Sequence, residues 1–407
     1  MSSELKKRAT EARTKKATLG SDVDVTVIPE DVSEKEKWTK LEDIPQELGQ
    51  KLVEVGVDVS GKERAGTYIQ MGNEVSFCSY EAEGVEIMPI YEALEKYSWL
   101  KDYYWKAVEV DLDKYTAECE LASSLMGYFI RAKKGVKQIF PLQSCLFINL
   151  DNTRQVVHNI ILAEEDSELN IITGCATDHG VKRAVHLGVS EFYVKRNAKV
   201  SFTMIHNWTE ETDVRPRTGI ILDDNAHFNS NYIIMSPTKS LQSNPKAILK
   251  GKNSSVYFQT LVYAQGNSKY DLGSIAILNG ENSKAEMIAR AIGTDNASVI
   301  SRGLIIGNEK DAKGHLDCQG LLMSPTARIY AVPELDARNP EISLTHEAAV
   351  GKISGEQILY LMSRGLSEDE ATSMIVRGFL EADTSRLPKA LADETRRLIE
   401  LAAESEM

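Results

Sequence analysis

"NAKVSFTMIHNW", residues 197–208, and "NSSVYFQTLVYA", residues 253–264, are two copies of the pattern that decides the fold of this chain. Each copy opens with an asparagine, which tolerates left-handed backbone and bonds its own main chain in turns. Each continues as an alternating apolar and polar run of the kind that forms a β-strand. The sequence therefore predicts one turn and one short strand for each copy.

The same opening recurs through the middle of the chain: Asn, a small residue, a variable residue and an apolar residue. Its clear copies begin at Asn197, Asn225, Asn253, Asn282 and Asn296, so that successive starts lie 28, 28, 29 and 14 residues apart. Weaker copies begin at Asp166, Lys313, Thr326 and Asn339. A strand-and-turn period of this length is typical of a β-solenoid, whose coils bury their apolar faces by stacking. Because parallel crossovers are almost always right-handed, we expect a right-handed parallel β-helix.

An antiparallel sandwich with regular turns is the alternative fold. Such a sandwich joins its strands through tight hairpins, which favour Asn-Gly and Asp-Gly turns. Few of these dipeptides occur in the chain. Their scarcity favours the solenoid.

The chain divides into three predicted regions. Residues 1–139 form a mixed α/β N-terminal region, residues 140–350 the β-helix core, and residues 351–407 an α-helical C-terminal domain. The fold class is therefore mainly β.

Helical patterns replace the strand pattern after residue 353. "SGEQ" from Ser354 and "SEDE" from Ser367 each place a serine three residues before Gln or Glu, which is the capping-box arrangement at a helix start. A later helix is predicted near residues 389–403. These helices either close the open end of the solenoid or form a docking platform for a partner.

Composition excludes several classes of protein. The net charge of −13 argues against a nucleic-acid binder, because such proteins gather Lys and Arg against phosphates. The charged N-terminus lacks the apolar core of a signal peptide, and no stretch approaches the 18 apolar residues of a membrane span. Five scattered cysteines without a CxxC pair suit a reducing compartment and argue against a closed zinc site. We therefore expect a cytoplasmic protein.

Candidate ligands for a metal gather in the last repeat units. Cys318 lies five residues after the unit start at Lys313, and His346 lies seven after the start at Asn339, so strand alternation predicts that both side chains share one face. Glu347 would point to the other face unless the chain bends there, where strand gives way to helix. Thiolate, imidazole and carboxylate together form a ligand set for iron or zinc. A lone strand cysteine is, however, commonly a small buried apolar residue.

The His-Glu pair is not half of a zinc-protease helix. That motif places a second histidine one turn after the first, and here the position holds Val350. The pair therefore needs another explanation.

Three phrases in this part of the chain, in order, resemble the SufB/SufD family of iron–sulfur cluster assembly scaffolds, and the SufB branch more closely. They are Cys318 followed by "QGLLMS", then "VPELDARNPEISLTHEAAVGKI" at residues 332–353, and "GLSEDEATSMIVRGF" at residues 365–379. The resemblance extends more loosely back to about residue 140. It implies a scaffold, not an enzyme, on which iron and sulfide form a transient cluster for transfer to apoproteins.

The resemblance also implies roles for individual residues. Cys318 matches the family's scaffold cysteine, Glu347 its carboxylate ligand, and His346 the neighbouring histidine. Cys175 looks like the cysteine that accepts sulfur from a donor, and a buried structural thiol is the competing interpretation.

Partners follow from the same resemblance. The β-helix core would pair with a second copy or a SufD-like protomer, and the C-terminal helices would hold a SufC-type ABC ATPase. That ATPase must supply the energy, because the chain has no GxxxxGK[ST] phosphate loop. The apolar residues expected to face the ATPase are Ile358, Leu359, Met362, Met374, Ile375 and Phe379. Family complexes are also linked to reduced flavin, for which the sequence offers no site.

Two other functions remain open at this point. Only the single Cys78 and Cys119 stand where bacterial SufB proteins often carry an N-terminal cysteine cluster, which leaves room for a SufD-like structural subunit without its own cluster. A carbohydrate-active β-helix enzyme would use paired acids such as Asp223 and Asp224, although both lie at a repeat turn where Asp is expected for backbone reasons.

Overall fold

Two long β-sheets make up most of the protein. The computed structural model describes residues 3–80 and 82–380. The first sheet has the order β2 (Glu74–Tyr80), β1 (Gly66–Met71), β5 (Leu142–Ile148), β7 (Glu168–Thr177), β9 (Lys199–Asn207), β11 (His227–Ile234), β14 (Ser255–Ala264), β17 (Lys284–Gly293), β19 (Lys313–Leu322) and β21 (Ser343–Lys352). The second has the order β12 (Ser240–Ser243), β15 (Lys269–Leu272), β18 (Ser298–Gly307), β16 (Ile275–Leu278), β13 (Lys246–Leu249), β10 (Thr212–Leu222), β8 (Ala184–Val194), β6 (Thr153–Ala163), β4 (Tyr128–Ala132) and β3 (Val85–Pro89), and β20 (Arg328–Ala337) also pairs with β18.

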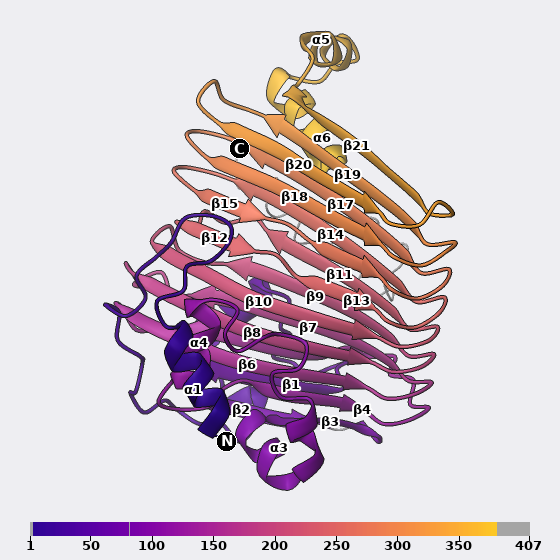
Figure 1. Cartoon of the computed structure of the whole chain (residues 1–407). Helices are drawn as coiled ribbons and strands as arrows, with labels where there is room; N and C mark the ends of the chain where they lie inside the picture. The colour runs from indigo at the N-terminus through magenta and orange to yellow at the C-terminus, as the bar shows by residue number, and fades with distance from the viewer. Residues whose placement is uncertain (1–2, 81, 381–407) are drawn as a thin grey trace.

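From β5 onward the chain passes alternately between the two sheets, and neighbouring strands within each sheet run parallel. Figure 1 shows the resulting coils stacked along one axis, with the C-terminal helices at one end. The predicted fold class, a mainly β chain with a parallel β-helix core, a mixed N-terminal region and C-terminal helices, is therefore confirmed. The antiparallel sandwich is wrong, because parallel pairing of successive coils replaces hairpin pairing.

The repeated asparagines hold the turns between coils. Asn197, Asn225, Asn253 and Asn282 all have left-handed backbone, with φ between 54° and 59°. Their side-chain amides also form a ladder, in which each Nδ2 donates to the Oδ1 of the asparagine one coil earlier, at 3.0, 3.0 and 2.8 Å. The pattern recurs because each asparagine satisfies its own turn and its neighbour's side chain.

Two predicted repeat units are out of phase with the structure. β19 begins at Lys313 itself, and the left-handed turn residue is Asp311 with φ of 58°. β21 begins at Ser343, four residues after Asn339 instead of two. In both units the start of the strand is displaced by two residues from its predicted position. Because side chains alternate between the two faces with a period of two residues, the predicted face of each side chain is unchanged.

The main hydrophobic core fills the space between the two sheets. Phe192 from the second sheet contacts Phe202 and Phe228 from the first, with ring centroids 4.9 and 5.0 Å apart, and Phe258 continues the stack one coil on. Each coil thus buries aromatic surface against its neighbours, which a single coil could not do.

The N-terminal region supplies helices to the outer faces of both sheets. Its helices are α1 (Ser3–Ala12), the 3₁₀ turn η1 (Leu41–Asp43), α2 (Gln46–Glu54), α3 (Ile90–Lys96), the 3₁₀ turn η2 (Ser98–Asp102) and α4 (Lys114–Leu121). α1 and α4 lie against the second sheet, and α2 lies against the first. β1 and β4 join the sheets in parallel with β5 and β6, so the sheets extend into this region.

Glu191 of β8 anchors the N-terminal region to the solenoid. Its fully buried carboxylate accepts hydrogen bonds from the backbone N–H groups of residues 105–108 at 2.6 to 3.2 Å. His158 Nε2 lies 2.8 Å from the same carboxylate. Several donors on one buried carboxylate compensate its loss of water.

The C-terminal helices described are α5 (Gly355–Ser363) and α6 (Glu368–Phe379). The predicted capping box at α6 is confirmed, because Ser367 Oγ accepts from Glu370 N while Ser367 N donates to the Glu370 carboxylate. The box predicted at Ser354 is wrong: no side chain caps α5. The helix predicted near residues 389–403 lies outside the described residues.

Candidate functional site

Cys318 lies in β19 on the inner face of the solenoid, 3% exposed. Its in-register neighbours are Ala289 on β17 and Ala348 on β21, two small residues that leave space around the sulfur. Ser301 Oγ, from the opposite sheet, donates to Sγ at 3.7 Å. Burial raises the pKa of the Cys318 thiol, and the Ser301 hydrogen bond opposes that shift. The thiol is therefore largely protonated in this state.

His346 and Glu347 lie on β21, the last strand, and point to opposite faces. His346 pairs in register with Leu316, two residues from Cys318, so His346 and Cys318 share the inner face with Cα atoms roughly 8 Å apart diagonally. Glu347 pairs with Asp317 on the outer face, where Asp317 forms an ion pair with Arg290 at 2.5 Å. The structure thus brings His346 toward Cys318 and separates Glu347 from it.

No three His, Cys, Asp or Glu side chains within residues 3–80 and 82–380 are close enough to hold a metal ion together. Cys318 and His346 supply at most two ligands on one face. A complete site needs further groups, either from a moved strand or from another molecule.

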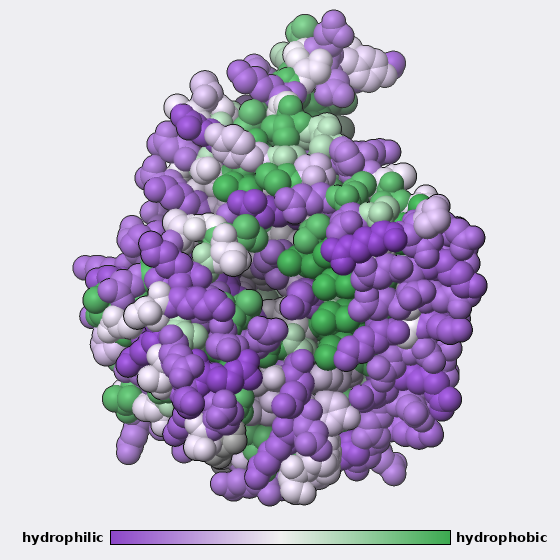
Figure 2. Space-filling view, in the orientation of Figure 1, coloured by the Kyte–Doolittle hydropathy of each residue, from purple (hydrophilic) through white to green (hydrophobic). Residues whose placement is uncertain are grey.

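Within residues 3–80 and 82–380, no element covers the last coil of the solenoid. β21 has a strand neighbour on one side only, and its residues are exposed except for the half-buried Leu344. Tyr330 and Val350 are exposed at 51% and 41%. Figure 2 shows hydrophobic side chains gathered on this end, over the last strands and beside the C-terminal helices. The apolar end surface lies one coil beyond Cys318.

Cys175 lies on the inner face of β7, fully buried, five strands from Cys318 in the first sheet. Its register neighbours are Leu146 and His206. Burial raises the pKa of this thiol well above its usual value. At roughly 4.8 Å per strand, the two cysteines are about 24 Å apart along the solenoid.

Polar and aromatic side chains that the sequence analysis missed surround Cys175. His206 Nδ1 lies 3.3 Å from the Tyr232 hydroxyl, and the Trp208 ring lies 5.5 Å from His206 and 5.0 Å from His186. Burial lowers the pKa of His186 to about 3 and that of His206 well below its usual value, so both are neutral. The phrase "HNW" within the repeat was the available signal, because His206 and Trp208 interrupt an apolar inner face.

Two small cavities lie inside the solenoid between these cysteines. One, of about 40 Å³, is lined by Tyr232 and extends to Thr260 and Ser274. The other, of about 20 Å³, shares Thr260 and Ser274 and reaches Cys318. The cavities therefore adjoin and are bordered by hydroxyl groups as well as apolar side chains. Each is large enough for a water-sized guest.

Asp223 and Asp224 have the contacts of turn residues. Asp224 Oδ1 accepts the backbone N–H of Lys252 at 2.8 Å on the next coil, and Asp223 lies 3.8 Å from Lys195 Nζ. Their placement agrees with the backbone explanation for both acids.

The apolar residues predicted to face a partner lie on α5 and α6. Leu359, Met362 and Met374 are exposed at 66%, 39% and 46%. Ile358, Ile375 and Phe379 are half-buried, and Phe379 packs against the cluster on the outer face of the first sheet. Hydrophobic side chains thus remain uncovered on both helices.

None of the helices within the described residues is long and apolar enough to cross a membrane.

Known proteins match this chain over most of its length. Residues 146–379 match the family model described as the SufBD core domain of SUF system FeS cluster assembly. An iron–sulfur cluster assembly SufBD family protein of Methanothermobacter thermautotrophicus is 50% identical over 97% of this chain and 98% of its own length. A protein of the same description from Archaeoglobus fulgidus is 47% identical over 88% and 96%, and one from Staphylococcus aureus is 29% identical over 94% and 83%. The chain therefore belongs to the SufBD family and is a component of the SUF iron–sulfur cluster assembly system.

Proposed function

We propose that this protein is the SufB-like subunit on which the nascent cluster is built, with Cys318 as its thiolate anchor. The observation that carries the proposal is the position of Cys318: it lies inside the solenoid, one coil from the exposed last strand, beside a cavity that adjoins a second one reaching Tyr232. Thiolate is the preferred ligand of iron–sulfur species. Iron and sulfide are the substrates here, and the cluster is cargo for apoprotein acceptors.

Sulfur would enter at Cys175. A persulfide forms there when the thiolate attacks a polysulfide or donor persulfide, breaking its S–S bond and releasing the remaining thiolate. The roughly 24 Å to Cys318 is too long for direct attack by one cysteine on the other. Hydrosulfide, supplied with the polysulfide, would attack the outer sulfur of the Cys175 persulfide, break its S–S bond, restore the Cys175 thiolate and leave as HSS−. After HSS− passes through the two adjoining cavities, the Cys318 thiolate would attack it, form a persulfide and release HS−.

Binding of iron at Cys318 requires a change in the last coils. The thiol must lose its proton to bind metal, and burial now opposes that loss. Glu347 faces the outer side, so it can join Cys318 only if β21 twists or shifts. An exchangeable carboxylate ligand would favour release of the finished cluster, since oxygen binds iron–sulfide units less firmly than thiolate does.

The partners we propose fit the uncovered surfaces. A second copy, or a SufD-like protomer, would cover the apolar end of the solenoid, and a SufC-type ATPase would bind α5 and α6. ATP-driven movement of the ATPase subunits would then pull on the last coils through these helices. We place the protein in the reducing cytoplasm because all five cysteines are free thiols.

A SufD-like structural subunit is the second candidate function. The observation that favours it is the lack of three converging metal ligands among the described residues. Such a subunit would bind the ATPase and the second protomer while leaving cluster formation to its partner.

Mass spectrometry of protein treated anaerobically with ³⁴S-labelled polysulfide tests the proposal. We expect label on Cys175 and then on Cys318 in the wild type, and label only on Cys175 in Cys318→Ala. In Cys175→Ala, label at Cys318 should be lost, whereas Cys145→Ala, which removes an equally buried thiol, should behave as wild type. Label that never reaches Cys318 would support the SufD-like function instead.

A further inference from the structure

Another cavity of the protein lies on the outer side of the solenoid, away from Cys175 and Cys318. Its volume is about 190 Å³. Its floor is the outer face of the second sheet, one wall is the loop before α4, and the other is the N-terminal strap, which we define as residues 15–23. Three segments distant in sequence thus enclose one space.

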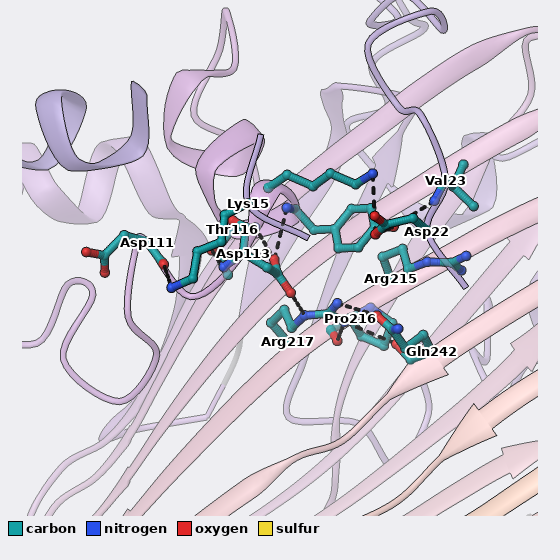
Figure 3. A network of polar contacts seen from close by, with 12 residues as sticks. Lys15, Asp22, Val23, Asp111, Asp113, Thr116, Arg215, Pro216, Arg217 and Gln242 are labelled. Carbon is teal, nitrogen blue, oxygen red and sulfur yellow. Dashed lines mark hydrogen bonds and ion pairs between the residues drawn. The ribbon is translucent and has the colours of Figure 1, made fainter. Parts of the chain in front are cut away.

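The strap is held in place by its own contacts, shown in Figure 3. Lys15 Nζ donates to the backbone carbonyl of Asp111 at 2.8 Å, and the Val23 backbone N–H donates to the Tyr115 hydroxyl at 2.9 Å. Gly20 has φ of 72°, and a Cβ there would lie 2.5 Å from Gln242 Nε2, so the strap passes directly over this side chain. The cavity is therefore a built feature of the fold.

The inner surface of the cavity is apolar with a few polar atoms. Leu19, Val108, Leu112 and Ile275 supply aliphatic surface. Gln242 is 5% exposed, and its Nε2 has no hydrogen-bond partner among the described residues. A buried amide donor without a partner costs free energy unless a guest or water accepts its hydrogen bond.

Four charged side chains line the cavity: the basic Arg217 and Lys246 and the acidic Glu109 and Asp113. Arg217 is already neutralised, because its Nε donates to Asp113 Oδ2 at 2.7 Å and its other nitrogens donate to Pro216 and Gln242. Lys246 is half-buried, lines the cavity and forms no ion pair within the described part of the chain. The exposed Glu109 also lines it and acts electrostatically on Arg8.

We propose that this cavity binds a small carboxylate with an apolar body, with Lys246 as its counter-ion and Gln242 Nε2 as a hydrogen-bond donor. The aliphatic lining would cover the body of the ligand. The volume suits a fragment of about ten heavy atoms, because pockets for drug-sized ligands start near 300 Å³. The proposal is independent of the cluster chemistry at Cys318.

Ligand-observed NMR with benzoate and its neutral isostere benzamide tests this site in the full-length protein. We expect benzoate to bind with a Kd of about 1 mM, as the efficiency of small ligands allows, and benzamide to bind about fivefold more weakly or worse. Lys246→Met, which keeps the length of the side chain, should weaken benzoate binding about tenfold. Lys246→Arg should retain it.

Lys250→Met is the matched control, because Lys250 is an exposed lysine in the turn after β13 and does not line the cavity. Its benzoate affinity should equal that of the wild type. Any of three results would overturn the proposal. They are equal affinity of wild type and Lys246→Met for benzoate, equal affinity of wild type for benzoate and benzamide, and no binding of benzoate to wild type at about 10 mM.

Discussion

At the scale of single residues, the inner face of this solenoid contains ionisable groups that are held neutral. His186 bonds Gln155 Oε1 through Nδ1 at 2.9 Å, and its neighbour His206 lies against Trp208 and Tyr232. Desolvation is the main cause of the lowered pKa of both histidines. A buried polar group costs stability unless it is hydrogen-bonded, and His206 Nε2 has no hydrogen-bond partner among the described residues.

These histidines predict a pH dependence of stability. In the unfolded chain each takes up a proton near its usual pKa of about 6.5, whereas the folded chain cannot protonate either until the pH is far lower. Stability is therefore lost as pH falls below about 6.5, by about 1 kcal/mol per histidine between about pH 7.5 and about pH 5.5. Urea unfolding at the two pH values measures the loss.

The double variant His186→Gln, His206→Gln should lose most of this dependence, although its stability at neutral pH will be lower. His179→Gln, which changes an exposed histidine, should retain the dependence of the wild type. If the double variant and the wild type lose equal stability on acidification, the assignment to these histidines is wrong.

Residue-level predictions from sequence succeeded where strand alternation alone was needed. Cys318 and His346 share a face because side chains along paired strands alternate with a period of two residues. The predicted strand starts were wrong by two residues, which leaves the face of each side chain unchanged. The phrase "HNW" marks His206 and Trp208 near Cys175, but the contact with His186 could not be predicted, because His186 comes from the other sheet and reaches Trp208 only through the winding of the coil.

At the scale of elements, the turns between coils carry specific stabilising contacts. Asn253 has φ of 56° and its side chain bonds both Asn225 and Asn282. Asn253→Ala should destabilise the protein by about 1–2 kcal/mol, because alanine pays for left-handed backbone and forms neither hydrogen bond. Asn253→Gly should cost less, since glycine adopts this conformation freely. If chemical unfolding shows that Asn253→Gly is less stable than Asn253→Ala, this account of the turn is wrong.

The C-terminal helices give a second prediction at this scale. Leu359→Asp should leave the free energy of unfolding within about 0.5 kcal/mol of wild type, because the side chain is 66% exposed, and should abolish binding of a SufC-type ATPase. Gln357→Asp adds the same charge at another exposed position of α5 and should still bind. Calorimetric titration with the ATPase distinguishes the two. Unimpaired binding of Leu359→Asp would remove α5 from the interface.

Elements were predictable from sequence where one local signal repeats. The Asn-led turns and the Ser367 capping box are such signals, and both appear in the structure. The structure of the N-terminal region could not be predicted from sequence. Its attachment depends on long-range contacts, such as the hydrogen bonds from the backbone of residues 105–108 to the buried Glu191 carboxylate. The boundaries of the three predicted regions stay predictions.

At the scale of the whole molecule, the solenoid joins a buried thiol toward its N-terminal end, on β7, to another near its C-terminal end, on β19. The stacked coils that build the core also align Cys175, the interior cavities and Cys318 along one axis. Among the described residues too few ligands converge to hold a cluster, so under our proposal assembly would require movement of the last coils or a second protomer. Our central claim is that Cys318 nevertheless anchors the nascent cluster.

Anaerobic reconstitution with ⁵⁷Fe and sulfide, in the presence of the ATPase and ATP, tests this claim most directly. Mössbauer and visible absorption spectra of wild type should show an iron–sulfur cluster. Cys318→Ala should show none, while Cys145→Ala, an equally buried thiol on the outer face of the first sheet, should match the wild type. A cluster of undiminished intensity in Cys318→Ala would contradict the account.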